Sequence, residues 1–339
     1  MQLTNKTPFE MAYTVLLDKR GAERLIVALK GTYSVDENGE IKLAEEQEPL
    51  IAAEKFYGEP DSSSIDKEAE LGPMKLATDV FLKGSAKATH SGTTRVDVAL
   101  RLGRLEKRAA VFGNRYWKDS LGVARISDPE PFDTIPLVWE NAYGGQDMTP
   151  EEEEHWAQQP ANPVGRGFRA KKSRAPWKDT LAPNIEDPAD LLRKPDHEVT
   201  PVGFGPIGRN WEPRVNYVGT CDEKWMEERM PLLPSDFDER FHNAAPPGLI
   251  TQGYLAGGEP VEVTGCTRRG RLAFTLPRVV PQTGVKLDGA LEPLELHLNT
   301  VTVDTDRMQL RLFWKGDMQV HGRILKLKYI ECRLAGETP

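Results

Sequence analysis

The sequence predicts a mainly β fold, with antiparallel sheets in a sandwich or barrel-like arrangement, a long irregular central insertion rich in Pro and Trp, and a few short helices. The first observation is that apolar and polar residues alternate with a period of two on both flanks of the chain, as in strands with one buried face. The second is that residues 129–260 contain 18 of the 26 prolines and five of the seven tryptophans. Long βαβ spacing is absent from the sequence, which favours antiparallel pairing.

Alternation is clearest in three stretches. In the first, Leu25, Val27 and Leu29 alternate with Arg24 and Lys30, so we expect one face of this strand in the core and the other in water. Residues 96–102 and 272–276 follow the same pattern. Nearer the C-terminus, apolar residues occupy even positions up to Leu298 and odd positions from Val301. A β-bulge around Asn299 and Thr300 explains this shift, because an extra residue moves the following side chains to the opposite face.

The central segment, residues 129–260, is expected to be ordered. Proline is typical of linkers, but tryptophans offer large areas for burial, which a solvated linker does not need. We expect two short helices there. One begins at Thr149, where Pro150 suits the first helical position and Glu152 completes a capping-box spacing. The other runs from about Asp222 to Met230.

Three regions follow from the contrast between flanks and centre. They are an N-terminal antiparallel β region, the Pro/Trp-rich segment and a C-terminal antiparallel β region: 1–128, 129–260 and 261–339. A chain of 339 residues is long enough for one large domain or two ordinary ones. We expect the first and third regions to pack together as one unit.

The composition argues against several classes of partner and location. The net charge of −8 and the pI of about 5.5 argue against nucleic acid as a partner. No apolar run approaches the roughly 18 residues of a membrane-spanning helix, and no secretory signal is visible, so a cytoplasmic location without membrane contact is expected. Cys221, Cys266 and Cys332 are odd in number and widely spaced, which indicates reduced thiols.

Familiar catalytic motifs do not explain this sequence. Residues 203–208 read Gly-Phe-Gly-Pro-Ile-Gly, the letters of a dinucleotide fingerprint, but prolines stand where that motif needs a strand before and a helix after. A glycine-proline turn is therefore favoured. Nucleophile-elbow, Walker and His-Glu-x-x-His patterns are also absent from the sequence. We expect no enzyme activity, no cofactor and no metal.

Acidic clusters supply the alternative functional hypothesis. Glu151 to Glu154 form a run that the first turn of a helix favours through its dipole. Asp236, Asp238 and Glu239, with His242 nearby, are the best candidates for a metal site or an acid–base pair. A hydrolase of sugar or peptidoglycan using these carboxylates would need a second carboxylate across a cleft.

A basic loop stands out against the acidic background. Five cations fall within nine residues, interleaved with aromatic side chains: Arg166, Arg169, Lys171, Lys172 and Arg174. A solvated loop is the first interpretation, an acidic protein surface the second, and single-stranded nucleic acid the third.

A set of short motifs resembles a bacterial family, domain of unknown function 2169, over about residues 1–290. The motifs comprise Asn5 to Phe9, Ala77 to Val80, Val111 to Gly113 with Arg115 and Trp117, Tyr143 to Gly145, Asn162-Pro163, Gly165 with Gly167 and Phe168, Pro183-Asn184, Glu186 to Pro188, Gly203 to Ile207, Trp211, Pro213-Arg214, Asp222 with Trp225, Leu233-Pro234, Asp236 to Asp238, and Phe241 with Asn243 to Pro246. Cys221 departs from the aromatic residue expected before Asp222.

The resemblance implies an adaptor or chaperone of the type VI secretion system. Such a protein binds a toxic effector, often PAAR-linked, and helps load it onto the VgrG spike. The resemblance implies no catalytic residues. A structural component of the secreted tip is an alternative from another class. The oligomeric state is left open.

The partner contact is expected in the central segment. Prolines hold backbone shape and reduce the entropy lost on docking, and aromatic and Arg residues dominate interface energetics. The residues expected near the effector are Arg166, Phe168, Phe204, Trp211 and Phe237. Core packing is the competing role for each of them.

Overall fold

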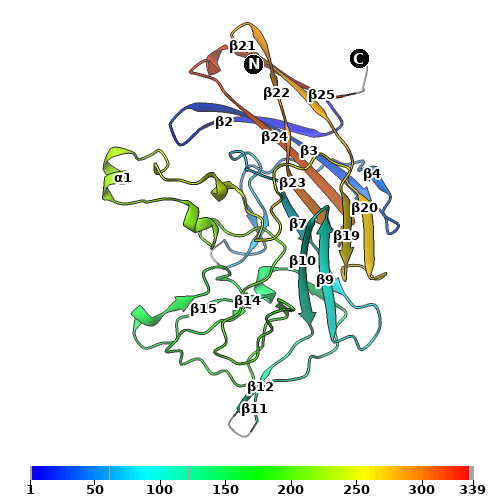
Figure 1. The fold of residues 1–339 in the computed structure, drawn as a ribbon, viewed down its shortest axis with the longest axis vertical. Coiled ribbons are helices and arrows are strands. Elements are labelled where there is room, and N and C mark those ends of the chain that lie inside the picture. Colours follow the sequence, from blue (N-terminus) through cyan, green and yellow to red (C-terminus); the bar gives the residue numbers. More distant parts are fainter. Residues whose placement is uncertain (1, 61, 121–122, 336–339) are drawn as a thin grey trace.

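A six-stranded sheet organises the fold around β3 (Glu23–Val35), as Figure 1 shows. The structure is a computed structural model and describes residues 2–60, 62–120 and 123–335. The strand order is β2-β3-β24-β23-β7, with β4 paired to the end of β3. The other strands are β2 (Glu10–Leu17), β4 (Ile41–Leu43), β7 (Asp79–Lys83), β23 (His297–Asp304) and β24 (Gln309–Gln319). Strands from both ends of the chain thus meet in one sheet.

A five-stranded antiparallel sheet lies beside it, in the order β18-β10-β9-β19-β20. Its strands are β9 (Arg95–Leu102), β10 (Leu105–Phe112), β18 (Ile185–Glu186), β19 (Pro260–Thr264) and β20 (Arg271–Thr275). Leu100 and Val263 from this sheet belong to the same buried cluster as Val27 and Leu312 from the six-stranded sheet. The two sheets therefore share one apolar core, as in a sandwich.

The N- and C-terminal strands meet in a third sheet, ordered β1-β25-β21-β22. Its strands are β1 (Gln2–Lys6), β21 (Pro281–Leu287), β22 (Ala290–Leu294) and β25 (Leu327–Leu334). Short two-stranded ladders complete the β structure: β5 (Lys55–Phe56) with β6 (Ile65–Lys67), β8 (Ser85–Lys87) with β13 (Thr134–Pro136), β11 (Trp117–Ser120) with β12 (Val123–Ile126), β14 (Tyr143–Gly144) with β17 (Arg166–Gly167), and β15 (Gln146–Asp147) with β16 (Ala157–Gln158).

The predicted fold class is confirmed. Among the strands named above, pairing is antiparallel except between β1 and β25, β7 and β23, and β14 and β17. The predicted bulge is also present: Leu298 lies opposite Trp314 and Thr300 opposite Phe313, so Asn299 is the extra residue in β23. The boundaries between the three predicted regions stay predictions.

The expectation that one face of β3 lies in water is wrong. The side chain of Lys30 is only 2% exposed and Thr32 only 1%. Residues 44–76, a segment that alternation did not predict as a strand, cover that face. Their side chains and carbonyl groups form hydrogen bonds with it. Gln47, for example, accepts a 2.8 Å bond from the backbone N–H of Thr32. Both faces of the sheet are therefore covered, one by the apolar core and one by this polar strap.

Of the two predicted helices, one is confirmed. Helix α1 spans Glu223–Glu228, and the Asp222 side chain accepts a 2.9 Å bond from Trp225 N. The helix expected from Thr149 is wrong: only a 3-10 turn, η2 (Glu153–His155), follows. The Thr149 hydroxyl donates to Asp147 and accepts from the backbone of Arg174 and Ala175 instead, so it does not cap a helix.

The remaining helical elements are single 3-10 turns: η1 (Trp139–Asn141), η3 (Arg214–Tyr217), η4 (Glu239–His242) and η5 (Ile324–Lys326). None of the helices within the described ranges combines the length and the apolar character needed to cross a membrane.

Candidate functional site

Two buried asparagines hold the central segment in place, Asn162 by bonds within the segment and Asn184 by a bond to the scaffold. Asn162 donates to the carbonyls of Trp139 and Tyr143, both at 2.9 Å. Asn184 donates to the Phe112 carbonyl at 3.0 Å, which ties the segment to β10. These side chains are at most 3% exposed. A buried carbonyl group without a hydrogen-bond donor destabilises the fold. The irregular backbone of the central segment does not supply these donors, so the asparagine amides supply them.

A buried ion pair serves the same segment. Arg115 bonds to Glu186 and to the Pro183 carbonyl, and its guanidinium lies 3.9 Å from the centre of the Phe112 ring. The second carboxylate oxygen of Glu186 accepts 2.9 Å from Leu192 N. Hydrogen bonds thus satisfy both carboxylate oxygens of Glu186, whereas the buried Nε of Arg115 has no partner within the described residues. Breaking such a pair leaves one buried charge uncompensated, so the pair holds this part of the structure together.

Close packing explains the glycine motif at 203–208. A Cβ at Gly203 would lie 2.6 Å from the Trp139 ring, and one at Gly208 2.8 Å from Trp211. The two indoles meet edge to face, with centres 5.9 Å apart. Trp139 Nε1 donates to the Pro206 carbonyl at 3.1 Å. The motif is a backbone path between aromatic rings, and the chain bends at residues 204–205.

An ion network joins the strap to the polar face of the six-stranded sheet. Lys30 contacts Glu70 at 2.9 Å and Glu48 at 3.5 Å. Glu48 also pairs with Arg311 at 3.0 Å, and Lys75 with Glu68. Burial raises the pKa of Glu70 against the opposing effect of Lys30. The sequence signal for this network was the run of charges in 44–76 opposite the polar positions of β3 and β24.

The network lines a partly open cavity of about 60 Å³. Neither side-chain polar atom of Asn299 has a hydrogen-bond partner within the described ranges, and Asn299 lines this cavity. Lys315 also lines it and donates to the carbonyls of Gly72 and Pro73, at 2.9 and 3.0 Å. Burial, with a contribution from nearby Lys75, lowers the pKa of Lys315 to about 7. A polar cavity of this size suits a few water molecules.

The five residues expected at a partner contact divide into two groups. Phe204, Trp211 and Phe237 are at most 5% exposed and belong to the interior. Arg166 and Phe168 are partly exposed. Arg166 donates from Nε to the Glu140 carbonyl at 2.9 Å. The structure does not bring the five together on one surface, because burial removes three of them.

The carboxylates near 236–239 have structural partners. Asp236 accepts bonds from the backbone and hydroxyl of Thr220, which lower its pKa. Asp238 caps η4 and pairs with Arg240, which lowers its pKa as well. Glu239 lies 3.1 Å from Nε2 of His242, whose pKa burial lowers to about 4, so the imidazole meets this carboxylate uncharged at neutral pH. These contacts explain the acidic cluster through local folding.

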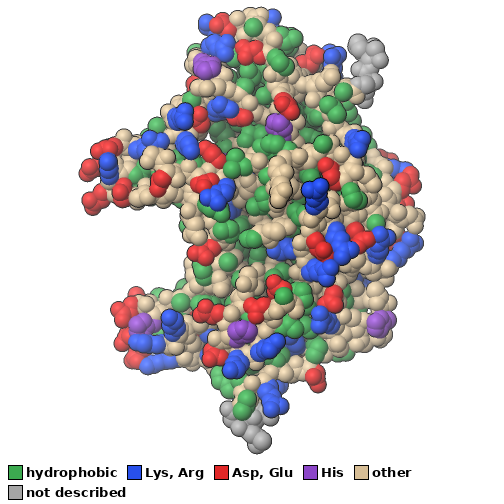
Figure 2. Space-filling model, in the orientation of Figure 1, with side chains coloured by type: hydrophobic (Ala, Val, Ile, Leu, Met, Phe, Trp, Pro, Cys, Tyr) green, Lys and Arg blue, Asp and Glu red, His purple; other side chains and the backbone are tan. Residues whose placement is uncertain are grey.

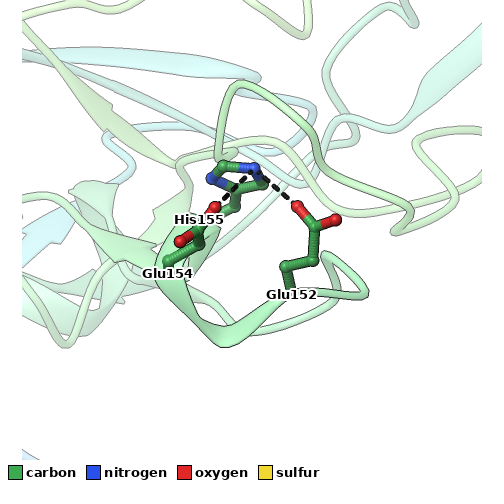
Figure 3. A group of neighbouring side chains, drawn as sticks. All are labelled: Glu152, Glu154 and His155. Carbon is green, nitrogen blue, oxygen red and sulfur yellow. Dashed lines mark ion pairs between the residues drawn. The ribbon is translucent and has the colours of Figure 1, made fainter.

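Glu152, Glu154 and His155 lie together in a cluster (Figure 3). The first turn of a helix was expected at these glutamates. His155 Nε2 lies 2.9 Å from Glu152 and 3.7 Å from Glu154. The ammonium of Lys172 contacts the same imidazole and lies 3.7 Å from Glu152. Because the Lys172 ammonium already lies next to the Glu152 carboxylate, we interpret the cluster as a group of surface ion pairs.

A family model described as an uncharacterized protein conserved in bacteria (DUF2169) matches residues 20–315. The chain belongs to this family. No curated protein and no solved structure matches the chain. The DUF2169 match covers the five-stranded sheet, the strap, the central segment and the six-stranded sheet apart from β2 and the end of β24. The asparagines, the Arg115–Glu186 pair and the glycine motif all lie within it.

Two projections distinguish the DUF2169 chain from a plain sandwich. We define the α1 arm as residues 215–235 and the β15 arm as residues 146–175. Both project on the same side of the molecule (Figure 1), and the surface is hollowed between them (Figure 2). Their large exposed apolar side chains are Met148 at 58%, Trp156 at 43%, Val215 at 39%, Met226 at 53%, Met230 at 61% and Leu233 at 36%.

The base of the α1 arm is held firmly. Trp225 Nε1 donates to the Leu232 carbonyl at 2.9 Å, which closes the arm on itself. Arg229 bonds to the Lys19 carbonyl, next to β2. The arm therefore presents its methionines from a fixed position. The sequence analysis did not single out these methionines, although Met226 lies within the predicted helix and Met230 at its predicted end.

Proposed function

We propose that this DUF2169 protein is an adaptor of the type VI secretion system that acts in the cytoplasm. It binds a toxic effector, PAAR-linked, and helps load it onto the VgrG spike. The family resemblance of the sequence motifs supports this role. The role requires a surface for another protein and no catalytic group.

The observation that carries the proposal is the exposed apolar surface of the two arms. Met226 and Met230 are more than half exposed on the α1 arm, as is Met148 on the β15 arm. Exposed apolar groups on projecting elements are typical of protein interaction sites. Methionine adapts its shape to a partner surface, and Trp156 adds an aromatic group of the kind that dominates interface energetics.

Charge surrounds these apolar groups. The β15 arm carries Glu151 to Glu154 together with the basic residues from Lys171 to Arg174, and acidic and basic side chains both gather at its end in Figure 2. Mixed rims of this kind select a partner by electrostatic complementarity and exclude mismatched ones. The effector surface is therefore expected to be apolar at its centre, with both signs of charge at its edge.

Co-expression with the neighbouring effector gene product tests the role. A tagged full-length chain should retain the effector and raise its soluble yield. The combined variant Met226→Ala and Met230→Ala should lose retention by the equivalent of about 2 kcal/mol or more, with an unchanged melting temperature. Leu325→Ala is the matched control, because Leu325 is 96% exposed and lies outside both arms.

Two outcomes would contradict the proposal. Undiminished retention after substitution of both arms would place the contact elsewhere. Recovery of the protein in the secreted fraction at the level of the spike would support the tip-component alternative.

A further inference from the structure

One side-chain amide faces the cavity between the strap and the six-stranded sheet without a hydrogen-bond partner. Asn299 is the extra residue of the β23 bulge and is fully buried. Its oxygen and its nitrogen both lack a partner among the described residues, and it lines the cavity together with its neighbour Thr300. Buried polar side chains normally have at least one partner. The bulge therefore presents an unused donor and an unused acceptor to the cavity.

One lysine of the same cavity lacks a carboxylate partner. The cationic residues that line the cavity are Lys30, Lys67, Lys75, Lys83, Arg311 and Lys315. The first five each form an ion pair with a carboxylate. In the part of the chain that the structure describes, Lys315 forms no ion pair and donates only to the Gly72 and Pro73 carbonyls. Because an ammonium group has three donors, one donor of Lys315 is left over.

The carboxylates of the cavity are already engaged by the other cations. Those that line it are Glu48, Asp66, Glu68 and Glu70, and each pairs with a lysine. The side chain of Lys315 is only 2% exposed, so water compensates little of its charge. A buried ammonium without a counter-ion is unfavourable. The cavity thus contains a buried amine without a counter-ion and a buried amide without a partner.

We propose that this cavity binds a small monovalent anion, of the size of chloride or formate, between the Lys315 ammonium and the Asn299 amide. The remaining N–H of Lys315 and the NH₂ group of Asn299 donate to the anion. The volume of about 60 Å³ limits the ligand to an ion of a few atoms. A metal cation does not suit the cavity, because cationic side chains surround it and its carboxylates are paired.

An anion supplies what water alone does not. Water satisfies the Asn299 amide but brings no negative charge to Lys315. An opposite charge nearby favours the protonated amine, so a bound anion should raise the pKa of Lys315. Burial holds that pKa at about 7 otherwise. Binding should therefore weaken as the pH rises through 7, by about tenfold between about pH 6 and pH 8.

Other charged groups act on Lys315 from three elements. They are Glu68, Glu70 and Lys75 of the strap, Asp79 of β7 and His242 of η4. Burial lowers the pKa of His242 to about 4, so this imidazole stays uncharged over the same range. Burial raises the pKa of Glu70, and its ionisation also weakens anion binding as the pH rises. The proposal is independent of the adaptor role.

Chloride NMR on the full-length chain tests the site. A chloride ion held by a protein relaxes faster than a free ion, so binding broadens the chloride signal. At constant ionic strength, kept with sodium gluconate, the wild-type chain should broaden the signal in a saturable way. Formate should remove the broadening. Formamide, which has nearly the same size and no charge, should not.

Two variants locate the site. Lys315→Met removes the charge, and Asn299→Asp introduces a carboxylate of nearly the same size as the amide, which serves Lys315 as a built-in counter-ion. Each should weaken chloride binding by about tenfold or more. Lys328→Met is the matched control, because it removes one positive charge from an exposed position of β25 outside the cavity. Melting curves verify that each variant folds, and the formate, formamide and pH measurements need the wild-type chain alone.

Three results would overturn the proposal. Absence of saturable broadening would mean that the cavity holds water only. Equal displacement by formamide and formate would show that the site does not recognise charge. Binding that Lys315→Met and Lys328→Met leave equally strong would show that chloride binds elsewhere on the molecule.

Discussion

Asn243 donates a 2.8 Å hydrogen bond to Asp79, a residue 164 positions earlier in the chain. The same carboxylate accepts 2.8 Å from the backbone of Ala244 and pairs with Lys75 at 2.6 Å. Asp79 begins β7, Lys75 ends the strap, and Asn243 belongs to the central segment. One fully buried carboxylate therefore joins the three parts of the molecule.

We expect Asp79→Ala to lower the free energy of unfolding by about 3–5 kcal/mol, because the buried Lys75 ammonium would keep only Glu68 as a carboxylate partner and the donors of Asn243 and Ala244 would lose their acceptor. Urea denaturation measures the change. Asp97→Ala is the control: its pair with Arg95 is exposed on both sides, and such pairs contribute about 0–1 kcal/mol. Equal midpoints for the two variants would contradict this role of Asp79.

We expect Gly203→Ala to destabilise the fold by about 1–3 kcal/mol, because its Cβ would overlap the Trp139 ring and displace it. Gly72→Ala is the matched control, since nothing lies within 4 Å of its added Cβ. Thermal melting compares the two variants. The near-ultraviolet circular dichroism of the tryptophans should change for Gly203→Ala alone, and identical spectra and melting temperatures would refute the packing argument.

Stability should rise with pH from about 7 to 10.5, in part through Lys315. Burial lowers the pKa of this amine from 10.5 to about 7, so in that window the unfolded chain holds a proton that the folded chain has released. Unfolding then takes up protons and becomes less favourable as the pH increases. Lys107, whose pKa burial lowers to about 8, contributes in the same direction.

The variant Lys315→Met isolates the contribution of Lys315. Urea midpoints measured across the window should rise less steeply for the variant than for the wild type, with the Lys107 contribution common to both. Parallel pH profiles would show that Lys315 titrates alike in the folded and unfolded states.

Purified protein should carry no stoichiometric transition metal and no cofactor. At Glu152, Glu154 and His155 the Lys172 ammonium competes with any added cation, and Asp236 and Asp238 are engaged by Thr220 and Arg240. Elemental analysis and an absorbance scan measure this directly. One zinc or iron per chain would overturn the prediction.

The periodicity of the sequence correctly predicted features that depend only on residues close in sequence. Alternation located β9, and the change of phase at Asn299 located the bulge, because side-chain direction follows directly from position in a strand. Lys30 was misplaced, since its burial depends on Glu48 and Glu70, which are distant partners that alternation does not encode. The helix predicted from Thr149 was wrong for the same reason. The Thr149 hydroxyl bonds to Asp147 and to the backbone of Arg174, so it does not cap a helix.

In the candidate site too, local features could be predicted from the sequence, and features that depend on distant contacts could not. The motif residues were recognisable as a set, but their task as internal hydrogen-bond donors, as at Asn184, required the neighbouring carbonyls in space. Exposure of Met226 and Met230 is likewise a property of the α1 arm's projection from the sheets. A short helix with an apolar residue near its end has the same sequence pattern whether it is packed or free.

The pairing of β3 with β24 also sets an order of events during synthesis. β3 ends at residue 35, yet its partner begins at residue 309, so a growing chain displays a long, apolar, half-paired strand while most of the remaining residues are translated. Contacts so distant in sequence form slowly. A ribosome-bound chain therefore exposes this edge of β3 until residues 309–319 emerge, and a general chaperone that covers apolar segments would protect it during that interval.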